Sequence, residues 1–205
     1  MAVMFTTGDR ITGPFGEATV SRAEQADVPG VLAVFDSAVS WLTRKGLSGQ
    51  WGATPFSAIP NMHKQFADWI AAGTLFIARI DGTVAGTLVI TDEVPSYAEH
   101  MWGRFPDTAL YIEAFATARS LEGLGLGRAL LGWAEEHATR NGKSELWLDC
   151  WADNPDLCDY YTRAGYNARG LLVVNQWHAR LFEKQLSPAE AERVLQNSPS
   201  STSNR

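Results

Sequence analysis

One short segment restricts the folds open to this chain more than any other. Residues 122–128 read Glu-Gly-Leu-Gly-Leu-Gly-Arg, between a run of strand-forming residues and a helical repeat. Alternating glycines remove the side chains that would keep an anion away from the N–H groups at the start of a helix. A tight turn with close helix packing is the plainer alternative. We predict instead a phosphate- or pyrophosphate-binding turn formed by Gly123, Leu124, Gly125, Leu126, Gly127 and Arg128.

The flanking residues place this turn inside a strand, turn, helix and strand unit. Residues 108–117 are rich in strand formers, and apolar residues then recur at helical spacing until Asn141-Gly142 ends the helix. Residues 145–151 predict the next strand. Because a helical crossover joins them, the two strands are expected to run parallel or nearly so.

The remaining residues predict an α/β domain around this unit. Asp27 and Pro29 begin a helix that ends near Gly46, and the turn Asp81-Gly82 joins two antiparallel strands. Further elements are predicted as a helix over 62–72, strands over 75–80 and 83–90, a short helix over 154–164, and strands over 169–175 and 177–184. We predict an N-terminal extension over 1–17, one domain over 18–186, and a polar, disordered tail over 187–205.

Composition excludes several classes of function. The chain of 205 residues has a formal net charge of −6 and a pI near 5.2, without a block of Lys and Arg, so nucleic acid is not an expected partner whereas a cationic amine is. Two cysteines and four scattered histidines predict reduced thiols and no metal. No segment is apolar enough to span a membrane, and none resembles a leader, which predicts a soluble, cytoplasmic protein.

Phosphate binding by itself leaves more than one fold open. In a dinucleotide-binding fold, Asp149 would stand at the end of the next strand, where an acid binds ribose. Against that fold, Arg128 takes the place of the third glycine, and too little sequence follows to build a second half. A phosphate-loop NTPase is disfavoured because no Gly-Lys-Ser or Gly-Lys-Thr occurs.

The segment from Leu110 to Tyr166 resembles the coenzyme A core of the GNAT superfamily of N-acetyltransferases, and residues 18–184 fit that family's order of elements. The family motif is Gln or Arg, two residues, Gly, one residue, then Gly or Ala. Gly125 and Gly127 match it, whereas Glu122 replaces the Gln or Arg. The resemblance implies a mixed, mostly antiparallel, twisted sheet flanked by helices, with a splayed central strand pair that holds acetyl-CoA as co-substrate. It also implies that the pantetheine arm pairs with the backbone of Phe115, Ala116 and Thr117.

A second motif supports the resemblance. Asn154-Pro155 is followed by Tyr161, Gly165 and Tyr166, similar to the family's Asn, short helix, Tyr, three residues, Gly and aromatic. The resemblance implies that Asn154 and Tyr161 contact the coenzyme and that Tyr161 is the general acid, because a phenol near the sulfur can protonate a departing thiolate. A core tyrosine is the alternative, since Tyr161 shares a helical face with Leu157.

Two carboxylates compete for the role of general base. Asp149 is the first choice, because some members of the family keep a carboxylate at this distance before the tyrosine, and Glu113 in the preceding strand is the second. Flanking Trp147 and Trp151 are expected to raise the pKa of Asp149 by desolvation. An ordinary hydrogen-bonded edge residue, or a base acting through water, stays open for either position.

The acceptor is expected to bind against the N-terminal helices and the loop after the hairpin, because these regions vary in the family. Trp41, Trp51 and Trp102 are candidates for an apolar wall, although core packing is the ordinary role of such residues. Asp36, Glu93 and Glu99 are candidates for the charge that attracts the amine. The sequence thus predicts an N-acetyltransferase of a small-molecule or peptide amine. It leaves open a non-catalytic coenzyme A sensor, and a homodimer formed by the C-terminal strand pair.

Overall fold

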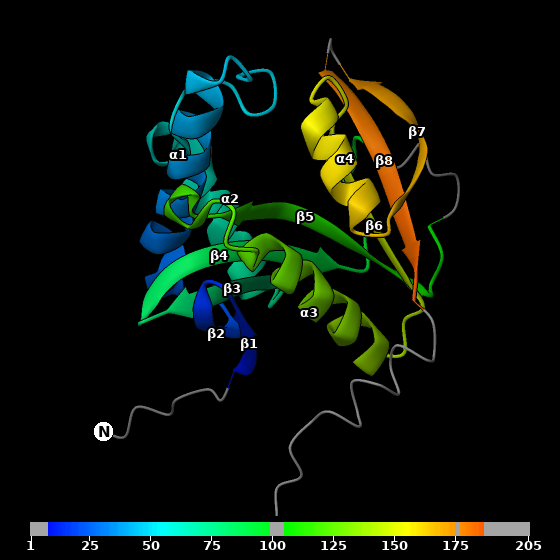
Figure 1. The fold of residues 1–205 in the computed structure, drawn as a ribbon, viewed down its shortest axis with the longest axis horizontal. Helices are drawn as coiled ribbons and strands as arrows, with labels where there is room; N and C mark the ends of the chain where they lie inside the picture. Colours follow the sequence, from blue (N-terminus) through cyan, green and yellow to red (C-terminus); the bar gives the residue numbers. More distant parts are fainter. Residues whose placement is uncertain (1–7, 99–104, 175–176, 187–205) are drawn as a thin grey trace, which may run out of the picture.

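The computed structural model describes residues 8–98, 105–174 and 177–186 as a single eight-stranded sheet with helices on both faces (Figure 1). The strands are β1 (Asp9–Gly13), β2 (Gly16–Arg22), β3 (Leu75–Ile80), β4 (Thr83–Thr91), β5 (Ala109–Thr117), β6 (Glu145–Trp151), β7 (Asn167–Val174) and β8 (Trp177–Gln185). The helices are η1 (Gln25–Asp27), α1 (Val28–Arg44), η2 (Phe56–Ala58), α2 (Pro60–Ala71), η3 (Arg119–Leu121), α3 (Leu126–Arg140) and α4 (Pro155–Arg163).

The sheet runs in the order β1-β2-β3-β4-β5-β6-β8-β7, and β5 with β6 is its one parallel pair among the described residues. This arrangement confirms the predicted mixed, mostly antiparallel sheet. It also removes the dinucleotide-binding alternative, because that fold is built on a largely parallel sheet with helical crossovers between successive strands.

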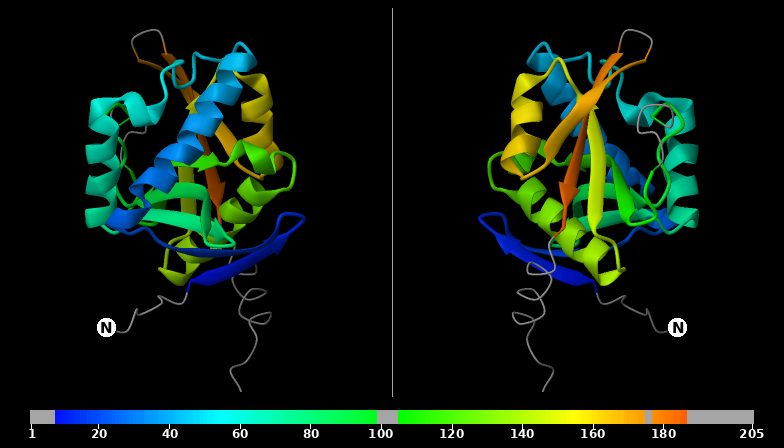
Figure 2. Two further views of the ribbon diagram at one scale, coloured as in Figure 1. Left: turned by 90° about the vertical axis from the view of Figure 1, so that its left-hand side faces the viewer. Right: turned by 90° about the vertical axis from the view of Figure 1, so that its right-hand side faces the viewer.

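Strand alternation divides the core into two layers. Phe76 and Leu88 point to the face covered by α3 and α4, whereas Ile77 and Val89, their neighbours in sequence, point to the face covered by α1 and α2. Figures 1 and 2 show the two helix pairs on opposite sides of the sheet. Each helix thus buries one apolar stripe against the strands.

The predicted elements between residues 28 and 185 are confirmed, with ends shifted by at most a few residues. Both central residues of the β3–β4 turn, Asp81 and Gly82, have positive φ values of 48° and 77°, as the tightest hairpin turns require. Strands β1 and β2 were not predicted. They pair with each other, and β2 pairs with β3, so residues 9–17 extend the sheet.

The central parallel pair separates part of the way along its length. Its register joins Ala109–Ile112 to Glu145–Leu148 and stops there. At the same level Ala114 takes a φ of 48°, and the register between β4 and β5 shifts between Thr87 and Val89. A bulge of this kind bends its strand. The bend turns the end of β5 away from β6, which is the splay expected from the sequence.

At one edge of the sheet, β7 pairs only with β8 and exposes Leu171 and Val173. Homodimer formation through this strand pair stays a prediction. In the described part of the chain, no helix combines the length and the apolar character needed to cross a lipid bilayer.

Candidate active site

The glycine turn presents unused N–H groups at the start of α3. Gly125 is the residue before the helix and has a φ of 83°, and Gly123 has a φ of 78°. Within the described residues, the N–H groups of Gly123, Gly125, Leu126, Gly127 and Arg128 donate no hydrogen bond. A Cβ atom added at Gly123 or Gly125 would meet only open space. The turn can therefore accept an anion at the positive end of the helix.

A cavity of about 440 Å³ lies over this turn, and we call it the glycine-turn cavity. It lies where β5 and β6 part, between α1 and α4, which stand on either side of the splay in Figure 1. Its lining includes all three residues predicted to pair with pantetheine, Phe115, Ala116 and Thr117. Among the described residues, no strand pairs with this edge of β5 beyond Ile112, so its backbone groups are open to a ligand.

An arginine lies beside the glutamate at the altered motif position. Glu122 accepts a hydrogen bond from Trp41 Nε1 at 2.9 Å and forms an ion pair with Arg119 Nη2 at 2.9 Å. The Arg119 guanidinium lies 4.1 Å from the centre of the Trp41 ring. Its Nε is buried and has no acceptor among the described residues. Because all three residues line the glycine-turn cavity, Glu122 holds a cation at its wall.

Helix α4 forms the opposite wall of the same cavity. Asn154 precedes the helix, and its Oδ1 accepts a hydrogen bond from Leu157 N at 3.2 Å. The Tyr160 hydroxyl is buried without a partner in the described chain, and it lies 2.8 Å from the place where a Cβ of Gly127 would stand. Glycine at 127 therefore lets α4 approach α3, and Tyr160 leaves a free hydroxyl at the cavity.

A second, smaller cavity of about 130 Å³ adjoins the first, and we call it the acidic cavity. Both predicted carboxylates, Glu113 and Asp149, line it. Four residues line both cavities, namely Gln50, Trp51, Phe115 and Tyr161. The strand splay thus brings the two acids and the predicted general acid to one junction.

Two tyrosine hydroxyls hold Asp149 in place. Tyr97 donates to Asp149 Oδ1 at 2.9 Å, and Tyr111 donates to the same oxygen. Asp149 Oδ2 receives no hydrogen bond from the residues that the structure describes. Burial raises the pKa of Asp149, and the two hydrogen bonds oppose that rise because they favour the charged carboxylate.

Glu113, the second carboxylate of the acidic cavity, has a raised pKa. Its side chain makes no hydrogen bond or ion pair with any other described residue. Burial, and then the charge of nearby Asp149, raise the pKa of Glu113 from its ordinary value of 4.5 to about 7. A carboxyl group with this pKa gains and loses a proton at neutral pH, which is what general base catalysis requires.

Tyr161 is both a core residue and a wall of the two cavities. It is 6% exposed, and its ring packs 5.6 Å from the Phe182 ring. Burial raises the pKa of Tyr161 well above its ordinary value, so the hydroxyl stays protonated at neutral pH. Tyr161 therefore packs in the core and also lines the two cavities, which the sequence analysis treated as alternatives.

The predicted acceptor residues lie in different places. Trp51 lines both cavities, whereas Trp41 lines the glycine-turn cavity and donates a hydrogen bond to Glu122. Trp102 and Glu99 lie outside the described residues. Asp36 is bonded to Ser57, through both the backbone N–H and the hydroxyl of that residue. Trp147, expected to desolvate Asp149, packs against Phe105 with ring centroids 5.3 Å apart.

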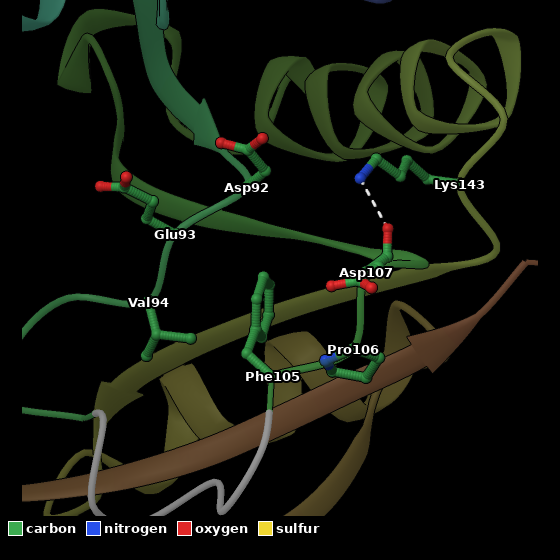
Figure 3. Close-up of a pocket in the computed structure, with 7 residues that line it drawn as sticks. All are labelled: Asp92, Glu93, Val94, Phe105, Pro106, Asp107 and Lys143. Carbon is green, nitrogen blue, oxygen red and sulfur yellow. Dashed lines mark hydrogen bonds between the residues drawn. The ribbon is translucent and has the colours of Figure 1, made fainter.

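Glu93 lines a third cavity (Figure 3). That cavity of about 640 Å³ begins just beyond the end of β4 and contains Lys143, which donates to the Asp107 carbonyl oxygen at 2.7 Å. It shares no lining residue with the glycine-turn cavity or the acidic cavity. The carboxylates that line the acidic cavity are Glu113 and Asp149 instead.

Sequence reasoning missed several residues of the site. Tyr111 could have been predicted, because it stands two residues before Glu113 on the same face of β5. Tyr97 could not, because its partner Asp149 lies 52 positions further along the chain. No sequence motif singles out Arg119 or Trp177.

Comparison with known proteins agrees with this geometry. Residues 38–166 match the family model described as the acetyltransferase (GNAT) family. The uncharacterized N-acetyltransferase YesJ of Bacillus subtilis strain 168 is 26% identical over 162 residues, which cover 78% of this chain and 86% of that protein.

Two solved structures share the fold. A GNAT family acetyltransferase from Listeria monocytogenes 4b F2365 has a TM-score of 0.67 at 21% identity, over 87% of this chain and 100% of that one. The Salmonella typhimurium protein yncA, solved with its cofactor acetyl-CoA, has a TM-score of 0.59 at 17% identity, over 83% of this chain and 94% of that one.

Proposed function

The chain belongs to the acetyltransferase (GNAT) family, and from that membership we propose that it is an acetyl-CoA-dependent N-acetyltransferase that acetylates a primary amine by direct transfer. One observation carries the proposal. An anion-binding cavity and an acidic cavity meet at Tyr161, so a thioester held in the first would face an amine held in the second.

The glycine-turn cavity suits coenzyme A by its backbone donors and its unpaired strand edge. The free N–H groups around Gly125 suit the pyrophosphate, and the unpaired edge of residues 115–117 suits the amide-rich pantetheine arm. Arg119 supplies the positive charge that Glu122 cannot, because Glu122 bonds to it and keeps it at the cavity wall. Asn154 and Tyr160 close the side formed by α4.

Bound acetyl-CoA supplies the thioester carbonyl, at which a carbon–nitrogen bond to the amine forms and the carbon–sulfur bond breaks. The chain's own residues manage the two protons. Tyr161 holds a proton at its hydroxyl for the departing sulfur, since its raised pKa keeps the phenol neutral until a thiolate develops.

Glu113 is the better candidate for the group that takes the proton of the ammonium. Sequence reasoning ranked Asp149 first, but the two acids lie close enough to titrate as a pair. The hydrogen bonds from Tyr97 and Tyr111 favour the charged form of Asp149, so the proton shared by the pair goes to Glu113. Asp149 then holds the ammonium group through its free Oδ2.

Calorimetry with acetyl-CoA, NADH and ATP tests the first half of the proposal. We expect selective binding of acetyl-CoA. Acetyl transfer to an amine library tests the second half, and Tyr161→Phe is expected to lower kcat by about 10²-fold or more while leaving acetyl-CoA affinity unchanged. Unchanged turnover would remove Tyr161 from the mechanism.

Two other results would overturn the proposal. Preference for NADH would exclude the acetyltransferase function. Tight acetyl-CoA binding without transfer to any amine would instead favour a coenzyme A sensor.

A further inference from the structure

The acidic cavity combines two carboxylates with an aromatic wall. Apart from the residues that it shares with the glycine-turn cavity, its aromatic lining residues are Tyr97, Trp151 and Trp177. Tyr97 and Trp177 meet edge to face, with ring centroids 6.2 Å apart. Indole and phenol faces bury apolar surface and also attract a cation, so this lining suits an ammonium group attached to an apolar body.

Cations are missing from the lining that the structure describes. The acidic cavity is lined by Glu113 and Asp149 but by no described lysine, arginine or histidine. Arg180, which stands opposite Cys150 on β8, is not among the lining residues. A ligand carboxylate here would therefore meet the negative charge of Asp149 beside the Glu113 carboxyl group, and no cationic partner among the described residues. Burying an unpaired charge is costly.

Two lining groups also remain without partners. Asp149 Oδ2 accepts nothing from the described chain, and the buried Trp177 Nε1 donates to nothing there. The first suits an ammonium donor, and the second suits a single acceptor atom such as a hydroxyl or ether oxygen. Both point to a ligand with one cationic head and little other polarity.

We infer that the acceptor is a small alkyl or arylalkyl primary amine with no carboxylate beside the amine, so that the site selects an amine over the amino acid of the same side chain. This inference rests on the proposed function, because it treats the acidic cavity as the acceptor site. Selection operates by exclusion, since an α-carboxylate adds an uncompensated negative charge next to Glu113 and Asp149.

Matched pairs test the inference. Binding to the protein saturated with coenzyme A is measured by calorimetry for phenethylamine and phenylalanine, tryptamine and tryptophan, and pentylamine and norleucine. Each amine is expected to bind at least about tenfold more tightly than its amino acid, a difference of about 1.4 kcal/mol. Equal binding within the pairs, tighter binding of the amino acids, or no binding of any amine would overturn the inference.

Phenylalaninamide separates charge from size, because it replaces the carboxylate by a neutral group of similar bulk. We expect it to bind more tightly than phenylalanine. Binding as weak as that of phenylalanine would contradict the exclusion by charge.

A variant outside the proposed proton-transfer groups provides an independent check. Gln50 lines the junction of the two cavities, and Gln50→Arg adds a cation there, whereas Gln50→Met keeps a similar length without charge. The arginine variant is expected to reduce the preference for amine over amino acid by about tenfold, and the methionine variant to keep it. An unchanged preference in Gln50→Arg would count against the inference.

Acetyl transfer is followed in the same mixtures, so that the two claims fail in different ways. Amines that bind selectively without being acetylated would keep the selection of amine over amino acid by the acidic cavity and remove the proposed function. Amino acids acetylated as well as their amines would keep the function and overturn the inference.

Discussion

At the scale of single residues, burial and then the nearby charge of Asp149 raise the pKa of Glu113 into the neutral range. Glu113 carries a pKa of about 7 because it is buried and because Asp149 is close. Asp149 carries hydrogen bonds that Glu113 lacks. Two carboxylates in one cavity thus acquire different roles from different partners.

The activity of the wild-type protein should therefore rise with pH and level off above about pH 7. The sign follows from the role of Glu113, since a general base acts only when deprotonated and its raised pKa keeps it protonated in acid. Glu113→Gln is expected to remove this rise and to lower kcat at pH 8 by about 10²- to 10⁴-fold. The measurement is kcat against pH with one amine for both proteins, so that ionisation of the amine is common to them.

Asp149→Asn is the matched control for this prediction. It removes the negative charge that helps to raise the pKa of Glu113, so the rise in activity should move to lower pH and persist. If Asp149→Asn abolished the rise and Glu113→Gln retained it, Asp149 would be the base, as the sequence first suggested.

Arg119 permits a second prediction at the residue scale. Arg119→Ala should weaken coenzyme A binding by about 10- to 100-fold, the range expected for hydrogen bonds to a charged group, and should leave binding of pantetheine unchanged because pantetheine lacks the pyrophosphate. Calorimetry with both ligands makes the measurement.

Glu122→Ala separates two roles for the altered motif position. If Glu122 positions Arg119, as its ion pair indicates, the variant binds coenzyme A more weakly. Tighter binding would show instead that the glutamate only repels the phosphates.

At the scale of elements, the start of α3 is the part on which we expect coenzyme binding to depend most. Gly125→Val places a branched side chain at a φ of 83° and in the open space of the turn, so we expect coenzyme A binding to fall below detection. Gly132→Ala is the control, because Gly132 lies within the same helix with nothing near its Cβ. It should stabilise the fold by up to about 1 kcal/mol and leave binding unchanged. Calorimetry and thermal unfolding of both variants make the comparison.

Elements that are marked by local sequence patterns could be predicted from the sequence. The glycine turn, the Asp81-Gly82 hairpin and the apolar stripe of α3 each lie within a few residues, so pattern alone locates them. Strand β1 escaped prediction because four of its five residues are exposed and only Ile11 is half-buried, so no apolar alternation marks it. Tyr97 escaped because its role depends on a contact with a distant strand. Local order was predictable, whereas the partners of Asp149 were fixed only by the packed fold.

At the scale of the whole molecule, the site belongs to both halves of the splayed sheet. One wall of the glycine-turn cavity comes from α1 and the end of β5, and the other comes from α4. Figure 1 shows these helices on opposite sides of the separation between β5 and β6. A ligand in the cavity therefore bridges parts of the chain that the central strands no longer join through hydrogen bonds.

This bridging makes thermal unfolding a test of the assembled site. A ligand that binds only the folded chain stabilises it by about 2.7 kcal/mol at a hundred times its Kd, which corresponds to about 5 to 10 °C in Tm for a domain of this size. Acetyl-CoA should produce this shift in the wild type and in Tyr161→Phe, because the variant keeps the ring that lines the cavity and loses only the hydroxyl assigned to transfer. Gly125→Val should show no shift, since its turn no longer admits the pyrophosphate. An equal shift with NADH would mean that the cavity recognises phosphates without recognising pantetheine, and the pairing assigned to residues 115–117 would then be wrong.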